Sequence, residues 1–499
     1  MIIDFSLAKN NELTFSVDGK YYHSKYNPSA EAEKWISQIQ CNYNPKVVIV
    51  LGAGLPYFLN LLTQKFCNSK ILLVQYNDEI YNIVNSNFNK NFTNDIFQIC
   101  TNQFSSAQNF SEYLFNNFGE ELSNQILFLS WKTSENIFVN EYNFTLNAIQ
   151  LYINKSKDLI ATRRFFSKKW ISNIIRFFNF TQNFYKIEKV NSDILIIASG
   201  TSLTNSLEKI KKHKDNFFII SVSSATKVLL HNKIIPDLIL TTDGGYWAKK
   251  HLQFLENENY DIPIMCTAES ALPFNLLKKN KIIPLEYNDF TNKYFFNKTN
   301  LHTMKVNRNG TVSGTALEVA KQLTDKNIFY IGLDLANTKG YQHAQPNILE
   351  TNDSLQDNFL NTKENRICIR NINSSALTTY KNWFENLSKS YTSNVKRIFN
   401  FETKNDLGNI KSTNWNKINF SKKLNTANII PQKNYQKINI EKIILEIIKN
   451  INDSEWLSNL SLGNILNYKK FNDKIFLQNA IAESKDFFYT QLQKLEKQK

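Results

Sequence analysis

The sequence predicts an α/β protein with a Rossmann-like N-terminal domain, a central doubly wound parallel sheet and a helical C-terminal region. Short uninterrupted apolar segments alternate with helical segments, a pattern typical of parallel strands buried on both faces. Two of these apolar segments, 46–51 and 194–198, run directly into turns made of small residues. At 499 residues the chain is too long for one hydrophobic core, so several domains are expected.

We expect four parts along the chain. They are a β element with a Rossmann-like domain (1–150), a helical connector (151–190), the central domain (191–350) and a mainly helical region (351–499). Apolar and basic residues alternate at helical spacing in the connector, and its aromatic residues are expected in the core. In the last part Leu, Ile and Phe recur at three- and four-residue spacing, which indicates helices.

The N-terminal domain contains a β-turn-α-β unit that resembles half of a Rossmann fold. Strands are expected at 46–51 and 71–75, with a helix over 59–65 between them. The turn Gly52-Ala53-Gly54 begins a glycine fingerprint, but the third glycine position is occupied by Tyr57. The pattern predicts the fold and leaves open whether a nucleotide binds there.

The first strand of the central sheet leads into the first candidate phosphate site. Strands are predicted at 194–198, 217–222, 237–242, 263–267, 282–286 and 327–332. Ser199, Gly200, Thr201 and Ser202 follow the first strand and precede a helix expected over 203–212. Hydroxyls and backbone N–H groups at a helix N-terminus favour an anion, so we expect nucleotide binding here.

A second small-residue turn precedes a later helix of the same sheet. Asn309, Gly310, Thr311 and Ser313 lie where the helix carrying Ala316 begins. The exposed N–H groups and hydroxyls predict a second anion site, while ordinary capping of the helix is the alternative.

Three titratable residues complete the candidate site. Asp243 and Asp334 follow strands at the mouth of the sheet, and His343 lies in the loop after the last predicted strand. Asp243 can orient a sugar hydroxyl or a metal, or simply cap the next helix. His343 suits a general base that activates a hydroxyl nucleophile, the alternative being a surface histidine.

Composition narrows the class of protein. The net charge is +15, but the lysines and arginines do not cluster, so a generally basic surface is expected and no nucleic-acid partner. Five scattered cysteines form no Cys-x-x-Cys pair, which argues against disulfides and a zinc site and fits a reducing compartment. No signal peptide or transmembrane segment is apparent, so a cytoplasmic protein is expected.

These motifs, in this order, resemble those of the motility-associated factor (Maf) glycosyltransferases, which modify flagellin. The resemblance covers about residues 10–410 and is strongest over 190–350. The matching stretches are 23–28 with Glu31-Ala32-Glu33, 50–55, 198–203, 235–237 with Asp243, 310–316, and 331–336 with His343-Ala344.

The resemblance implies a fold and a reaction. The central domain of that family is similar to bacterial sialyltransferases, with a CMP-activated nonulosonic acid (pseudaminic or legionaminic acid) as donor and Ser or Thr of flagellin as acceptor. By position, Ser199–Leu203 would hold the CMP phosphate or ribose, and Thr311 and Ser313 the donor phosphate and carboxylate. His343 would be the base, with no metal or cofactor required. Thr201 stands where the family usually has proline, which lacks the hydroxyl but fixes φ.

Two alternatives remain open. The central domain also resembles an archaeal hydroxymethyl-pterin pyrophosphokinase, in which Asp243 and Asp334 would hold Mg²⁺ with ATP phosphates. The other alternative is a non-catalytic flagellin-binding scaffold, because a fold alone does not establish turnover.

Overall fold

The computed structural model describes residues 2–88, 92, 95–335, 341, 343–369, 375–399, 406–420, 427–452 and 454–497. The chain forms two compact units. Unit 1 consists of Met1–Phe165 with Asn450–Tyr489, and unit 2 of Phe166–Lys449 with Thr490–Lys499. This division differs from the four expected parts, because the boundary falls inside one long helix and the C-terminal region is shared between the units.

Unit 1 contains the predicted hairpin and the Rossmann-like sheet. Its antiparallel sheet is formed by β1 (Ile3–Leu7), β2 (Leu13–Val17) and β3 (Lys20–Tyr21). Its parallel sheet has the order β6-β5-β4-β7, with β4 (Val47–Leu51), β5 (Lys70–Gln75), β6 (Ile96–Cys100) and β7 (Ile126–Ser130). Its helices are α1 (Pro28–Gln38), α2 (Leu59–Lys65), α3 (Asp78–Phe88), α4 (Ala107–Phe118), α5 (Lys132–Ile137), α17 (Ser454–Leu460) and α18 (Leu462–Phe471).

Unit 2 is built on a nine-stranded sheet with the order β14-β13-β12-β11-β10-β9-β15-β16-β17, parallel throughout. All six predicted strands are confirmed as β9 (Asp193–Ile197), β10 (Phe217–Val222), β11 (Leu238–Thr241), β12 (Ile264–Thr267), β13 (Ile282–Tyr287) and β15 (Ile328–Ile331). From β9 the chain winds one way through β10, and β15 then pairs on the other side of β9. The predicted doubly wound α/β fold is therefore confirmed, with its switch point between β9 and β15.

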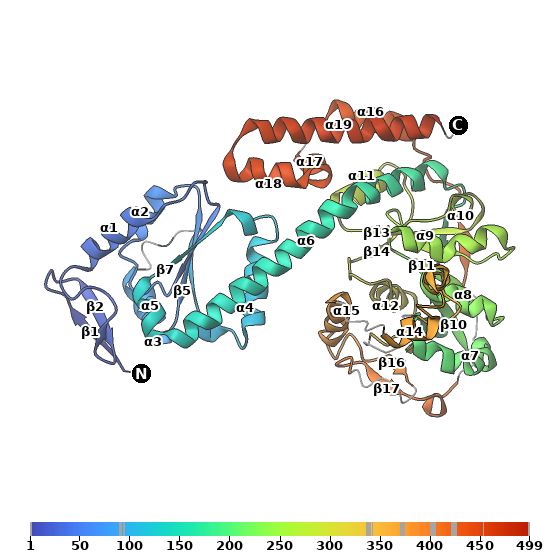
Figure 1. Ribbon diagram of the computed structural model, residues 1–499, viewed down its shortest axis with the longest axis horizontal. Helices are drawn as coiled ribbons and strands as arrows, with labels where there is room; N and C mark the ends of the chain where they lie inside the picture. The colour runs from blue at the N-terminus through green and yellow to red at the C-terminus, as the bar shows by residue number, and fades with distance from the viewer. Residues whose placement is uncertain are drawn as a thin grey trace. The chain divides into compact units, whose positions relative to one another are not determined.

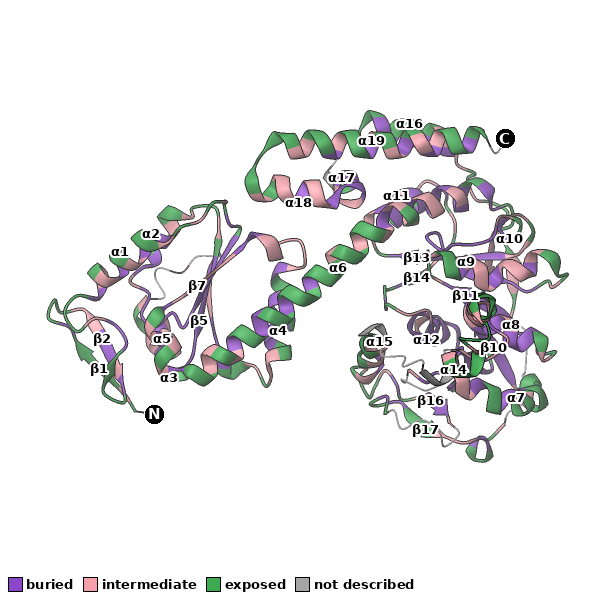
Figure 2. Cartoon of the chain, viewed as in Figure 1, coloured by how far each residue is buried: buried purple, intermediate pink, exposed green. Residues whose placement is uncertain are grey.

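Helices cover both faces of this sheet, and its central strands β9 to β13 and β15 are buried, while the edge strands β14 and β17 are partly exposed (Figures 1 and 2). On one face Leu317 and Ala320 of α12 belong to the core, and on the other Leu207 of α7 and Val228 of α8 do. The helices of this unit are α7 (Leu207–His213), α8 (Ser223–His231), α9 (Tyr246–Gln253), α10 (Phe274–Lys279), α11 (Phe290–Phe296), α12 (Val312–Leu323), α13 (Ile348–Asp353), α14 (Lys363–Ile369), α15 (Ser375–Glu385) and α16 (Ile440–Lys449).

Two long helices belong to both units, namely α6 (Val139–Phe180) and α19 (Lys474–Glu496). The expected connector is part of α6, which begins earlier than predicted. Near its end Ile174 and Phe178 are buried, as expected, but Phe165 is 63% exposed, so the expectation of a buried apolar face is wrong for the middle of the helix. No described helix combines the length and apolar character needed to cross a bilayer.

Residues 351–499 are mainly helical, as expected, and they also contain short strands: β16 (Val395–Ile398) and β17 (Lys411–Thr413) extend the large sheet, and β18 (Ile429–Pro431) pairs with β8 (Tyr185–Ile187). One local expectation is wrong. The helix expected over 203–212 is instead a 3-10 turn at Thr201–Ser206 followed by the short helix α7. Another strand not predicted, β14 (Met304–Val306), forms the far edge of the sheet.

Candidate functional site

The site lies at the carboxyl end of the large sheet, where β9 and β15 meet. Ser199–Ser202 follow β9, and Asp334 and His343 follow β15. Open α/β sheets bind ligands at this switch point. The structure thus brings together predicted residues from the turn and from the loop after β15. Ala336, the last residue of one matched motif, lies outside the described residues.

Asp334 is buried and anchors the turn after β9. Its carboxylate accepts the Ser202 backbone N–H at 2.9 Å, the Ser202 hydroxyl, and the Thr201 hydroxyl at 3.4 Å. A Cβ on Gly200 would lie 2.5 Å from this carboxylate and from the Gly332 carbonyl oxygen, so only glycine fits there. Because the Ser202 N–H is already bonded and no long helix starts here, the expected dipole cradle is not formed by this turn.

Three side chains form a hydrogen-bonded chain beside the turn. The Ser224 hydroxyl, at the start of α8, donates to Ser199 Oγ at 2.8 Å, and His343 Nδ1 lies 3.2 Å from the same oxygen. When Nδ1 carries the proton and donates to Ser199, Nε2 keeps the lone pair that a base needs. Burial lowers the pKa of the neighbouring His251 to about 4, so that ring, 6.2 Å from His343 between centroids, is neutral at pH 7.

The second predicted group lies at the N-terminus of α12. Thr311 is the N-cap residue, and its side chain makes no capping hydrogen bond, while Gly310 has φ +71°. Asn309 is buried, and its Nδ2 has no hydrogen-bond partner among the described residues. A buried amide donor without a protein partner costs free energy unless a ligand or a water molecule accepts its proton. Ser313 is also buried, and its carbonyl accepts the Tyr330 hydroxyl.

Asp243 is exposed at the end of β11, and its carboxylate accepts the Gly245 backbone N–H at 2.8 Å just before α9. This contact closes an Asx turn, while the N-cap of α9 is Gly245, which has no side-chain cap, so Asp243 does not take the capping role that the sequence left open. The ring of Tyr380 lies near Gly310, and burial together with the negative charge of Asp243 raises the pKa of the Tyr380 hydroxyl. The Tyr380 hydroxyl is therefore in the electrostatic field of Asp243, while its ring lies beside Gly310 in the turn before α12.

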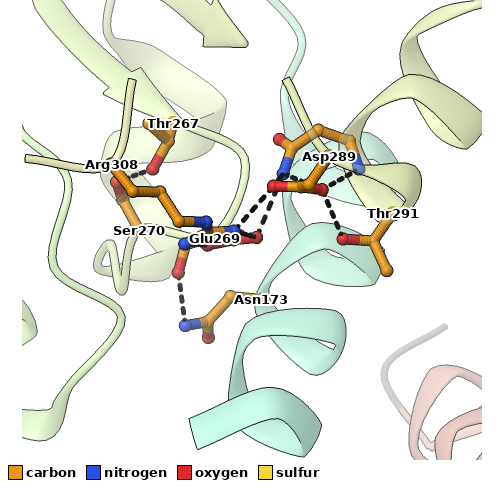
Figure 3. A network of polar contacts seen from close by, with 8 residues as sticks. Asn173, Thr267, Glu269, Ser270, Asp289, Thr291 and Arg308 are labelled. Carbon is orange, nitrogen blue, oxygen red and sulfur yellow. Dashed lines mark hydrogen bonds and ion pairs between the residues drawn. The ribbon is translucent and has the colours of Figure 1, made fainter. Parts of the chain in front are cut away.

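An ionic network that sequence reasoning missed supports the same loop; it joins a buried Glu269 to the more exposed Asp289 and Arg308 (Figure 3). Arg308, next to Asn309, donates from Nη1 to Glu269 at 2.8 Å and from Nη2 to Asp289 at 2.7 Å. Its guanidinium lies 4.9 Å from the Trp170 ring and 4.3 Å from the Tyr287 ring. Burial opposes its charge, but the two carboxylates outweigh burial and raise the arginine pKa.

One signal could have found most of these residues. Ser224, Glu269, Asp289 and Arg308 each come within two or three residues of the carboxyl end of a strand. The rule that selected Asp243 and Asp334, applied to every predicted strand, would have selected Ser224, Glu269 and Asp289, but not Arg308, because β14 was not predicted.

In the glycine turn after β4 of unit 1, the backbone N–H groups are hydrogen-bonded to other residues of this chain. The N–H groups of Ala53, Gly54 and Leu55 donate to Val74 O, Gln75 Oε1 and His23 Nε2. A Cβ on Gly54 would lie 2.5 Å from His23 Nε2. The backbone donors that would hold a phosphate are therefore already used.

The two carboxylates that the kinase alternative needs lie on different strands. β10 and β9 stand between β11 and β15, so their ends are separated by three inter-strand spacings, about 14 Å at ~4.8 Å each. Within the described ranges, no group of three or more His, Cys, Asp and Glu side chains is arranged to hold a metal ion.

The whole architecture has a solved counterpart. The structure of a MAf glycosyltransferase from Magnetospirillum magneticum AMB-1 superposes with a TM-score of 0.60, covering 98% of this chain and 86% of that one. The chain has a Maf-type fold. The predicted resemblance is thereby confirmed at the level of the fold, with 11% sequence identity.

The amino-acid sequence of the chain matches one family model and two curated proteins. Residues 168–340 match the family described as MptE-like, 6-hydroxymethylpterin diphosphokinase MptE-like. An uncharacterized protein of Treponema pallidum is 29% identical over 294 residues, covering 59% of this chain and 64% of that protein. A second uncharacterized protein of that organism is 29% identical over 84 residues, covering 16% of this chain and 40% of that protein. The chain thus spans less than two thirds of either relative.

Proposed function

We propose that this chain is a glycosyltransferase that moves a nonulosonic acid of the pseudaminic or legionaminic type from a CMP donor to Ser or Thr hydroxyls of flagellin. The observation that carries the proposal is the Ser224–Ser199–His343 chain at the switch point of a Maf-type fold. It supports a general base beside the crevice where such sheets bind ligands.

In this reaction the acceptor oxygen forms a bond to the anomeric carbon of the donor sugar. The bond from that carbon to the CMP phosphate oxygen breaks, and CMP takes the electron pair. Nε2 of His343 accepts the proton of the attacking hydroxyl, while Ser199 holds Nδ1 and fixes the tautomer.

The departing phosphate needs donors rather than covalent help. The N-terminus of α12, which no side chain caps, and the unpartnered Asn309 amide suit this task, with the hydroxyls of Thr311 and Ser313 nearby. Arg308 and Asp334 are positioning residues, because each holds a loop of the site through carboxylate contacts.

Intact-protein mass spectrometry of flagellin tests the proposal. Purified protein is incubated with the organism's flagellin and either CMP-pseudaminic or CMP-legionaminic acid, and CMP release is recorded in parallel. We expect a mass gain of one or more sugar residues together with released CMP. No mass gain and no CMP release with either donor would refute the transferase.

Two further readouts address the alternatives. AMP release from ATP and Mg²⁺ with hydroxymethyl-pterin would establish the pyrophosphokinase instead, whose family name alone does not assign that activity. Binding of flagellin without any turnover would establish the scaffold. His231, an exposed residue at the end of α8, provides a control for substitutions of His343.

A further inference from the structure

A basic pocket of about 330 Å³ lies on unit 2, outside the residues assigned so far. It is lined by Lys227, Lys250, Gln253, Phe254, Asn257 and Ile348. Lys250 also lies 5.4 Å from the Tyr246 ring, but neither pocket lysine forms an ion pair with a described carboxylate. Two such ammonium groups over an aromatic and an aliphatic wall favour an anion that carries apolar atoms.

Three of the lining residues, Lys227, Lys250 and Ile348, are close in sequence to residues at or beside the candidate site. Lys227 lies three residues after Ser224 on α8, so the two share a face of that helix. Lys250 is next to His251, whose ring lies beside His343. Ile348 follows Asn347, whose side-chain amide donates to the Ser224 carbonyl oxygen at 3.2 Å.

The pocket lies on the acceptor side of the proposed reaction. α8 packs on the face of the sheet opposite α12, where the donor phosphate is expected, and Ala344, next to His343, packs in the core of the α8 face. A base must contact the acceptor hydroxyl, and an acceptor must approach away from the leaving phosphate. A ligand beyond His343 on the α8 side is therefore the acceptor.

The chain beyond Ile348 favours a polypeptide there. It continues through α13 into a segment in which Leu355, Phe359 and Leu360 are 83%, 96% and 89% exposed. Arg366 braces this segment through ion pairs with Glu350 and Asp357. Large apolar side chains gathered on one exposed segment are typical of protein-binding surfaces.

We propose that Lys227 and Lys250 bind the carboxylate of an Asp or Glu side chain next to the acceptor hydroxyl, so that the enzyme selects acidic acceptor segments. This inference rests on the proposed function. Its test measures binding alone, with no sugar nucleotide present, so that failure of transfer and failure of this subsite are read separately.

The test uses ligand-observed NMR of the full chain with two synthetic peptides that differ only in charge. One has a central Ser flanked by Glu, and the other has Gln in place of Glu. We expect the acidic peptide to bind about tenfold more tightly, and we expect K227Q/K250Q to abolish that preference. K211Q/K249Q, which removes two charges that do not line the pocket, should retain it.

Several outcomes would overturn the subsite. These are no binding of either peptide, no preference in the parent chain, or a preference that survives K227Q/K250Q while thermal melting shows all variants folded. If free N-acetylneuraminic acid loses affinity in K227Q/K250Q and the peptides do not, the pocket holds the carboxylate of the sugar and the acceptor assignment is wrong.

Discussion

The turns after β4 and β9 occupy the same topological position in two different sheets, and only one of them leads to a candidate site. In each sheet the chain winds away in one direction, and a later strand, β7 or β15, pairs on the other side. Both strands are uninterrupted apolar runs that end in small residues. The two turns differ in what distant parts of the chain place against them.

In unit 1 a buried histidine fills the turn, and in unit 2 a half-exposed histidine borders it. His23 accepts the Leu55 N–H and lies against Gly54, whereas His343 lies within hydrogen-bonding distance of the Ser199 hydroxyl. In both sheets the small residues of the turn are needed because other parts of the chain pack closely against it. A ligand site also requires that nothing from the same chain occupies the space.

The largest expected effect separates the two histidines by function. His343→Ala should lower the rate of CMP release in the transfer reaction about 10²–10⁴-fold while leaving CMP binding and stability nearly unchanged. His23→Ala should do the reverse, because it leaves the buried Leu55 N–H unpaired and opens a cavity, costing about 3 kcal/mol of unfolding free energy. Steady-state kinetics and guanidinium titration measure the two quantities.

His231→Ala is the matched control and should change neither quantity. If His343→Ala retained the parent rate, His343 would not be the base. If His23→Ala were as stable as the parent, the turn of unit 1 would not depend on that ring.

A loss of stability similar to that of His23→Ala tests how tightly the turn of unit 1 is closed. Gly54→Ala places a Cβ at φ +59° and 2.5 Å from His23 Nε2, so backbone strain and overlap add. We expect a loss of about 3–4 kcal/mol of unfolding free energy, measured by guanidinium titration.

Gly19→Ala separates the backbone strain from the steric overlap. Gly19 has φ +78°, but its added Cβ would meet nothing within 4 Å, so only the strain of about 1 kcal/mol remains. Equal losses in the two variants would show that His23 does not crowd Gly54.

The stability of the folded chain should also depend on pH through the buried His23. Burial lowers the pKa of His23 to about 3, while an unfolded histidine titrates near 6.5. Between these values the unfolded chain binds a proton that the folded chain does not, so stability falls as the pH is lowered. From pH 7.5 to 5.0 we expect His23 to account for a loss of about 2 kcal/mol.

Hydrogen exchange resolved by mass spectrometry can follow this loss in peptides containing Leu55. His23→Gln keeps an acceptor for that N–H and cannot titrate, so its exchange should depend less on pH than that of the parent. His251 in unit 2, whose pKa burial also lowers, to about 4, serves as an internal reference. An unchanged pH dependence in His23→Gln would assign the acid sensitivity to other groups.

The sequence predicted the strands of the large sheet well where burial makes them continuous apolar runs. It missed β16 because Lys396 and Arg397 interrupt that pattern. Arg397 is nevertheless buried, and it lies in the electrostatic field of Asp334. A charged residue in a buried strand is thus explained by the site that it supports, which no local pattern reveals.

The candidate site was predicted in its parts but not in its connections. Each of Ser199, Asp334 and His343 follows a strand, which local patterns can identify. The bond from Ser224 to Ser199 and the grip of Asp334 on Ser202 join residues far apart in sequence. The same carboxylate holds the turn in a 3-10 conformation, which is why the helix does not begin where propensity predicted.

The smallest expected effect concerns Thr201, where the chain departs from the usual proline of the family that it resembles. Gly200 has φ −60° and ψ +157°, the conformation that a residue before proline prefers, and Thr201 is the first residue of the 3-10 turn. Thr201→Pro should therefore be accepted, gaining about 0.4–1 kcal/mol from the unfolded chain and losing only the 3.4 Å contact to Asp334. Thermal melting should show a change of a few degrees at most, and CMP affinity should match the parent. A large loss of stability would mean that the Thr201 hydroxyl, and not the carboxylate bonds to Ser202, holds this turn against β15.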